Sequence, residues 1–402
     1  MHRLALAALG ASAFVYVTAE TLPVGLLPEI SSGLHVSESA VGLLLTSYAV
    51  VAGVTTIPLT AITMRIPRHR LIAVTVAIFA VSQVCAALAP SFAVLVLARL
   101  ICAVAHGVFW SAIAPVAARL APPSMAGRAT AMVFAGNSLA IVLGVPLGTA
   151  LGQWLGWRAA VAVLGGLGVV CVLVLLRVLP AMPALPKDLG TSLRTRLHAS
   201  VAILRSRPVA AVCLITVVLV VGHFAAYTYI APLVRRDGGL TGTGLSALLL
   251  GYGAFGLIGN WAAGRFVDRR PGPLLLTLIG ALTVSLLALI PVWGVVPTVA
   301  AALLWGGAFT ASPVCLQAAV LRVAPEARDA ASAVYVVAFQ VGIGAGALVG
   351  ERLFSAGRLA ALPLIGAVMV AFSGVLVLLN RTAFPRTAGG LGSRPEPRTK
   401  AK

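Results

Sequence analysis

Residues 158–179 read RAAVAVLGGLGVVCVLVLLRVL, and no charged side chain falls between Arg158 and Arg177. An apolar stretch of about 20 residues is long enough, as a helix, to cross the hydrocarbon core of a bilayer. A backbone exposed to lipid must satisfy its own hydrogen bonds, and a helix does this within one segment. This stretch therefore predicts a transmembrane helix.

Apolar runs of similar length recur on both sides of this stretch. Alternating segments of the kind that build membrane barrels are absent from the sequence. The first run is too long for a signal peptide, and no small-residue cleavage site follows it cleanly. We therefore predict an all-α membrane protein with twelve transmembrane helices, at about 4–27, 40–63, 71–89, 92–117, 129–150, 158–179, 209–234, 244–265, 274–293, 297–321, 331–352 and 359–380.

The composition supports a membrane protein. Hydrophobic residues make up 60% of the chain and charged residues 10%, against about 25% charged in soluble proteins. The net charge of +19 does not indicate nucleic-acid binding, because the basic residues occupy short gaps between apolar runs. The five cysteines each lie inside an apolar run, so neither a disulfide framework nor a metal site is expected.

The distribution of basic residues predicts the orientation. If the N-terminus is cytoplasmic, the cytoplasmic loops and tails hold 23 of the 29 Lys and Arg, the outer loops hold five, and Arg99 lies within a helix. Lys and Arg concentrate on the cytoplasmic side of membrane proteins. We therefore expect a multi-pass membrane protein with both termini in the cytoplasm.

The chain divides near its middle. Residues 181–208 are polar and basic and begin among three prolines, which is typical of a linker. They separate an N-terminal six-helix half at 1–180 from a C-terminal half at 209–381, and residues 382–402 are expected to form a disordered cytoplasmic tail. The two halves resemble each other: Arg119-Leu-Ala-Pro recurs as Arg322-Val-Ala-Pro, 203 positions later. Duplicated, pseudo-symmetric halves are typical of transporters.

Several motifs coincide with this duplication. They are Gly264-Arg-Phe-Val-Asp268-Arg269, Arg99 followed by Ala105-His106-Gly107, and Gly144-Val-Pro146-Leu-Gly148. Together they resemble the major facilitator superfamily, in its twelve-helix drug/proton antiporter branch. Residues 18–28, which read TAETLPVGLLP, and 227–232, which read YTYIAP, are similar to bacterial sugar efflux transporters. The resemblance implies proton-coupled export of a sugar or a small drug-like compound across the bacterial inner membrane by alternating access, with no cofactor besides the proton gradient.

One departure from the family pattern concerns the loop after the second helix. The resemblance implies an acid where this chain has Met64, whereas the second-half copy keeps Asp268. We therefore expect an asymmetric conformational latch that is centred on Asp268, with Arg269, Arg322 or Arg328 as its partner.

Ionisable residues within the predicted helices are candidates for proton coupling. Glu20 is the only acid well inside a predicted segment, where a carboxylate costs roughly 3 kcal/mol unless it is paired or hydrated. Arg99 could respond to the charge of Glu20, and His223 falls within one residue of the repeat-equivalent position of Glu20. Alternatively, Glu20 lies near the outer surface and stays hydrated, and Arg99 binds backbone carbonyls. His223 and His106 are then neutral packing residues.

Polar and aromatic residues within the helices could line a substrate cavity, where rings stack and amides donate or accept hydrogen bonds. The candidates are His106, Asn137, Tyr227, Tyr229, Tyr252, Gln317 and Gln340, with Trp110 and Trp305. For each aromatic residue, packing or an interfacial position is the alternative.

Glycines recur every four residues in two helices and predict close helix packing. They are Gly144, Gly148 and Gly152, with Pro146 among them, and Gly342, Gly346 and Gly350. In the resembled fold these helices lie at the interface between the halves, and the first motif is typical of exporters.

Other functions are weighed against export. The Gly-Pro motif of the fifth predicted helix disfavours uptake of a small solute by the same fold. A membrane-embedded enzyme would need clustered acids, His or Cys, and the predicted helices show no such cluster. No ATP-binding loop of the GxxxxGK[ST] kind occurs, which disfavours a primary pump. The expected partners are a small-molecule substrate, protons and the bilayer, with no nucleic acid and a monomeric state.

Overall fold

The computed structural model describes residues 2–182, 197–198, 201–240 and 242–387. The predicted linker and tail therefore lie mostly outside the described residues. Within the described part, eleven helices are long and apolar enough to cross a membrane, and Ser47–Thr63 forms a shorter apolar segment of a further helix. These twelve segments occupy the twelve predicted positions.

The N-terminal half contains six membrane-crossing segments. In chain order its elements are α1 (Arg3–Gly25), α2 (Leu27–Leu34), α3 (Glu38–Thr63), α4 (Arg68–Ala87), α5 (Phe92–Arg119), the short turn Pro123–Met125, α6 (Ala126–Leu139), the π-helix η2 (Ala140–Gly144), α7 (Val145–Leu155) and α8 (Trp157–Val178). The fifth crossing is thus built from α6, η2 and α7, because Pro146 lacks the N–H that a continuous helix needs.

The C-terminal half repeats this plan. Its elements are η3 (Ile203–Arg205), α10 (Arg207–Tyr227), α11 (Ile230–Gly238), α12 (Gly242–Phe266), α13 (Pro271–Ala288), α14 (Val295–Val323), α15 (Arg328–Ser355) and α16 (Ala361–Leu379). The predicted seventh span, 209–234, is divided between α10 and the short helix α11. The same break follows α1, where α2 begins, so both halves place a short helix after their first crossing.

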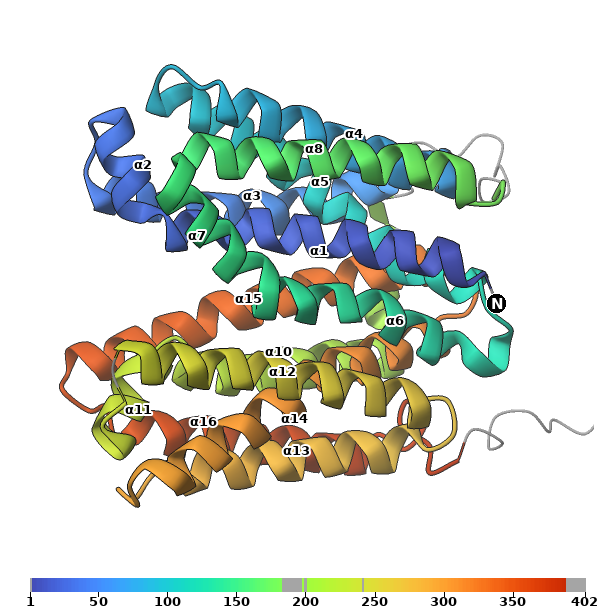
Figure 1. Cartoon of the computed structure of the whole chain (residues 1–402). Helices are drawn as coiled ribbons and strands as arrows, with labels where there is room; N and C mark the ends of the chain where they lie inside the picture. The colour runs from blue at the N-terminus through green and yellow to red at the C-terminus, as the bar shows by residue number, and fades with distance from the viewer. Residues whose placement is uncertain (1, 183–196, 199–200, 241, 388–402) are drawn as a thin grey trace, which may run out of the picture.

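The two halves lie side by side as separate bundles (Figure 1). α6 contacts α12 and α14 across the interface, and α15 contacts α3 and α5 in the equivalent way. We call the end where α1, α4 and α10 begin the basic end, and the end that carries α2 and α11 the opposite end. Large apolar side chains such as Leu97, Leu176 and Val368 are exposed on the helices, as a lipid-facing surface requires.

The chain stays packed slightly beyond the predicted tail boundary. Ala383 and Phe384 are buried, and Gly272 N–H donates to the Pro385 carbonyl at 3.1 Å. Residues 388–402 lie outside the described residues.

Candidate functional site

Glu20 and three other side chains, which come from three helices of the N-terminal half, lie close together. Glu20 lies on α1, Tyr48 on α3, and Arg99 and His106 on α5. We call these four residues the Glu20 cluster. The Glu20 side chain is 22% exposed, so its carboxylate is only partly buried.

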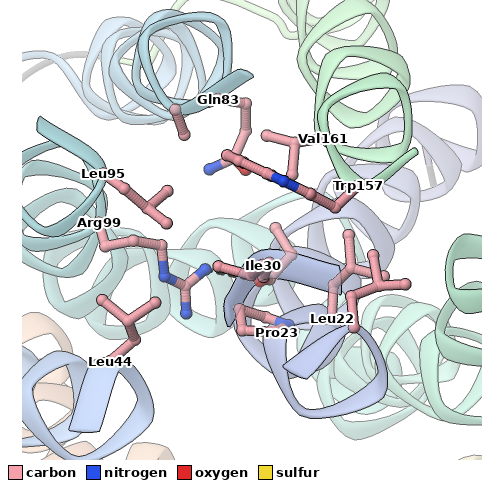
Figure 2. A pocket seen from close by; sticks show the side chains of 12 residues that line it. Leu22, Pro23, Ile30, Leu44, Gln83, Leu95, Arg99, Trp157 and Val161 are labelled. Atoms are coloured by element: carbon pink, nitrogen blue, oxygen red, sulfur yellow. Dashed lines mark hydrogen bonds between the residues drawn. The ribbon is translucent and has the colours of Figure 1, made fainter. Parts of the chain in front are cut away.

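Arg99 holds the end of α1. Its Nη1 donates to the Ala19 carbonyl at 2.6 Å and its Nη2 to the Glu20 carbonyl at 3.0 Å. Its guanidinium also lies 4.7 Å from the centre of the Tyr48 ring. The side chain is 4% exposed and points into the space between α1, α4, α5 and α8 (Figure 2). Arg99 thus joins α5 to the backbone that carries Glu20, which was the alternative given for it above.

His106 lies beside Glu20. Its Nε2 is 4.0 Å from Glu20 Oε2, and its ring packs edge-on against Tyr16 and Tyr48. The sequence analysis assigned His106 to the substrate cavity. In the structure His106 lies beside Glu20, where protonation of the Glu20 carboxylate changes the charge next to its ring. The helical spacing of Arg99 and His106, two turns apart on α5, was the signal that could have grouped them.

His223 lies apart from the Glu20 cluster, in the C-terminal half. Trp305 Nε1 donates to its Nδ1 at 2.9 Å, and the ring stacks on Phe309 and Tyr227. An Nδ1 that accepts a hydrogen bond carries no proton, so the imidazole is neutral in this arrangement. The geometry agrees with the packing alternative for His223 and does not bring it to Glu20.

The predicted cavity residues do not form one group. Tyr252 packs beside Tyr227 and Trp305, whereas Tyr229 stacks on Phe354 near the opposite end. Gln317 is buried and donates to Ser332 Oγ at 3.0 Å.

Two other candidates, Asn137 on α6 and Gln340 on α15, are half-buried. The Gln340 Cβ lies 4.0 Å from the position a Cβ on Gly53 would take, so Gln340 adjoins α3 across the interface. Trp110 is also half-buried and packs against Phe134.

Asp268 joins the halves at the basic end, but not through an arginine side chain. Its carboxylate accepts from the backbone N–H groups of Gly127 at 2.7 Å and Arg128 at 2.9 Å, at the start of α6. Burial raises the pKa of Asp268, and these two hydrogen bonds and nearby Arg322 oppose the rise. Arg322 is close enough to attract this carboxylate electrostatically, so a latch between Asp268 and Arg269, Arg322 or Arg328 stays a prediction. A helix N-terminus offers unpaired N–H groups, which bind a carboxylate directly.

A second contact between the halves was missed. Asp329, at the start of α15, lies 3.3 Å from Arg68 and 3.4 Å from Arg119, both in the N-terminal half. Asp329 and Arg68 are almost fully buried, whereas Arg119 is 27% exposed. Two sequence signals pointed here: Arg119 begins the repeated Arg-x-Ala-Pro motif, and Asp329 is one of only ten acids.

The glycine faces pack within each half and not between the halves, which corrects the expectation above. A Cβ on Gly148 would lie 2.8 Å from Leu22, and one on Gly152 would meet Leu26, so this face contacts α1 and its continuation. Gly144 likewise faces Thr18 and Phe14 of α1. The remaining three, Gly342, Gly346 and Gly350, face α10 of their own half. Pro146 lies at the start of α7.

No metal-binding group is found among the described residues: three or more His, Cys, Asp or Glu nowhere come together in them.

Two similar bundles of membrane-crossing helices, joined by contacts at one end, define a transporter built from duplicated halves. The profile of the Major Facilitator Superfamily matches residues 9–347, and the chain belongs to this family. It is 41% identical over 358 residues to a chloramphenicol efflux pump of Mycobacterium tuberculosis, covering 87% of this chain and 85% of that protein.

Solved structures of the same family share the fold. The human organic anion transporter MFSD10 (TETRAN) superposes with a TM-score of 0.75 at 16% identity, covering 94% of this chain and 98% of that one. The Escherichia coli fucose:proton symporter FucP gives the same TM-score and identity, covering 93% and 98%. The protein is thus a bacterial membrane transporter of the drug-efflux type and not an enzyme.

Proposed function

We propose that this protein exports chloramphenicol or a similar small neutral aromatic compound in exchange for protons. The observation that carries the proposal is the Glu20 cluster: a partly buried carboxylate within a membrane bundle, beside a histidine and a buried arginine. The likeness to a chloramphenicol efflux pump over most of both chains supports the choice of substrate. The energy source is the proton gradient, with no cofactor.

Glu20 is the proton carrier in this mechanism. A charged carboxylate at membrane depth is costly, and protonation removes that cost. Arg99 is held by two backbone carbonyls and keeps its position whichever form Glu20 takes. Proton binding therefore changes the charge beside Arg99 and His106 without dismantling the α1–α5 contact, and it shifts the preference between conformations.

The described state is closed at the basic end. The contacts that join the halves at this end include the hydrogen bonds of Asp268 and the ion pairs of Asp329, and Asn260 donates to the Ala131 carbonyl at 2.8 Å. By the positive-inside rule this end faces the cytoplasm, and both termini lie on the cytoplasmic side of the bacterial inner membrane. Opening these contacts admits substrate from the cytoplasm, and closing them directs release to the outside.

Half-buried aromatic residues suit an aromatic substrate. Trp110 and Tyr227, one from each half, offer ring faces for stacking, and Asn137 and Gln340 offer amides for the substrate's hydroxyl and amide groups. The protein works as a monomer, and one chain supplies all of these residues. A sugar is the second candidate substrate, because aromatic faces and amides serve a sugar equally well.

The test uses purified protein in proteoliposomes with an imposed pH gradient and radiolabelled chloramphenicol, with pentoses as the second substrate arm. Wild-type protein should move chloramphenicol against the proton flow. Glu20→Gln should lose gradient-driven transport while keeping substrate exchange at equal pH. Glu351→Gln, which changes a carboxylate that is 53% exposed near the opposite end, is the control and should behave like wild type. Gradient-driven transport by Glu20→Gln at the wild-type rate would remove Glu20 from the mechanism.

A further inference from the structure

A cavity lies between the two halves at the basic end and shares no residue with the Glu20 cluster. It has a volume of about 190 Å³, whereas one water molecule needs roughly 10–15 Å³ of such space. The N-terminal half forms one wall, which includes Ala126 and Thr130, and the C-terminal half forms the other, which includes Asp268, Arg322 and Arg328. Because both halves build it, the cavity exists only while the basic end is closed.

The two arginines of this cavity wall are poorly balanced by negative charge. The Arg328 side chain makes no hydrogen bond or ion pair with the described residues, and its Nε is buried without an acceptor. Within the same described part of the chain, Arg322 donates only to the Ala383 carbonyl, at 3.3 Å. Asp268 is the one carboxylate on the wall, and its oxygens already accept from two backbone N–H groups. The wall therefore carries two positive charges against one negative charge.

The chemistry of the wall selects an anion with several oxygens. A guanidinium presents its N–H donors in a planar fork that matches the oxygens of a phosphate, so two guanidinium groups on one wall suit one tetrahedral oxyanion. A monatomic ion would fill little of the 190 Å³. A metal cation is disfavoured by the excess of positive charge and by the hydrogen bonds that already occupy Asp268.

We propose that this cavity binds a phosphate group from the cytoplasmic side, with Arg322 and Arg328 as its partners. The group belongs to a soluble phosphate or to the headgroup of an anionic phospholipid. An occupant that needs both walls binds only the closed state and shifts the population toward it. Phosphate therefore restrains the opening through which substrate enters. The restraint rests on the proposed transport cycle, whereas the binding itself does not.

Inorganic phosphate is the first probe. The unfolding temperature of the purified protein in detergent is followed while sodium phosphate replaces sodium gluconate at constant pH and ionic strength. Wild type should show a rise that saturates in the millimolar range. Arg322→Gln and Arg328→Gln should each weaken the apparent affinity at least tenfold. Arg265→Gln, at an exposed arginine of the same end that does not line the cavity, is the matched control and should bind like wild type.

Nanodiscs separate the two sources of the phosphate group. If a lipid headgroup is the occupant, phosphatidic acid should raise the unfolding temperature above that in phosphatidylcholine alone, and added phosphate should have no further effect. If a soluble phosphate is the occupant, sodium phosphate should give the same rise in both membranes. The proposal is overturned if neither phosphate nor phosphatidic acid raises the unfolding temperature, or if the rise is the same in wild type and both arginine variants.

Access to the interface measures the restraint on opening. Ala114 is fully buried on α5 among core residues of the C-terminal half and does not line the cavity, so Ala114→Cys reports opening once Cys85 is replaced by serine. In inside-out vesicles, the ligand identified above should lower labelling by an impermeant maleimide at least threefold, and Arg328→Gln should abolish this effect. Binding without slower labelling would refute the restraint, and with it the link to the transport cycle, while the phosphate site would stand.

Discussion

Asp329→Asn should open the basic end. The substitution keeps the size of the side chain and removes the charge that pairs with Arg68 and Arg119. Asp329 and Arg68 are 2% and 1% exposed, so Arg68 would be left as an uncompensated buried charge in the closed state. Removing one partner of a buried pair costs about 3–5 kcal/mol. Arg119 is 27% exposed, so the loss of its ion pair with Asp329 costs only about 0.2–1 kcal/mol.

The cost applies only while the basic end is closed, because water reaches Arg68 once the halves separate. Each 1.4 kcal/mol changes an equilibrium about tenfold, so 3–5 kcal/mol shifts the open-to-closed ratio by roughly a hundred- to several-thousand-fold. Arg119→Gln should shift it by less than about tenfold. Glu326→Gln, at an exposed acid three positions from Asp329, should leave it unchanged.

The assay measures access to a cysteine placed between the halves. Ala318 is buried and lines the space beside Asp268 and Arg328, so Ala318→Cys reports opening there. Cys85, the exposed native cysteine, is first replaced by serine. An impermeant maleimide is added to inside-out vesicles, and the labelling rate of this reporter protein is compared with and without the Asp329→Asn substitution. A rate within twofold of the parent would refute the buried-pair reasoning.

Three further outcomes follow from the contacts described. Asp268→Asn should raise labelling of the same reporter by roughly 10- to 100-fold. The two charge-assisted hydrogen bonds of Asp268 are worth about 1.5–3 kcal/mol each, and an asparagine weakens them but still accepts one. An unchanged labelling rate would exclude a latch at Asp268. Gly148→Leu should express but lose export, because its side chain meets Leu22 of α1, whereas Gly166→Leu, with open space around its Cβ position, should transport normally; equal transport by both would contradict the packing. His223→Phe should lower the unfolding temperature, because Trp305 Nε1 loses its acceptor at a cost of about 1–3 kcal/mol, while the pH dependence of transport stays that of wild type; a shifted pH profile would return His223 to proton coupling.

The twelve crossings could be predicted from sequence because their signal is local. A long apolar run between charged gaps is sufficient, and the structure places a helical segment at every predicted position. The breaks within crossings were harder to predict. Pro146 marked the fifth crossing, but the π-helix Ala140–Gly144 that precedes it leaves no sequence pattern of its own.

The direction in which each side chain points could not be predicted. Membrane helices are apolar on every side, so periodicity does not tell which face meets which neighbour. For this reason Gly148 was expected to face the other half, whereas it faces α1. His106 was separated from Glu20 for the same reason, although the two lie on adjacent helices. Residue type suggested that these positions mattered, and only the fold shows their partners.

Met64 has no acid group, and the latch of the first half therefore differs in its chemistry from that of the second half. In the second half the loop supplies the anion, Asp268, and α6 supplies backbone N–H groups. In the first half the relation is reversed, because the anion, Asp329, belongs to the helix α15 and the loop side supplies Arg68. The two hydrogen bonds of Asp268 are partly exposed, at Arg128, while the Arg68–Asp329 pair is buried. Water and ions therefore reach the Asp268 contact first, and separation of the halves should begin between α6 and the α12–α13 loop, with the α15 contact breaking last.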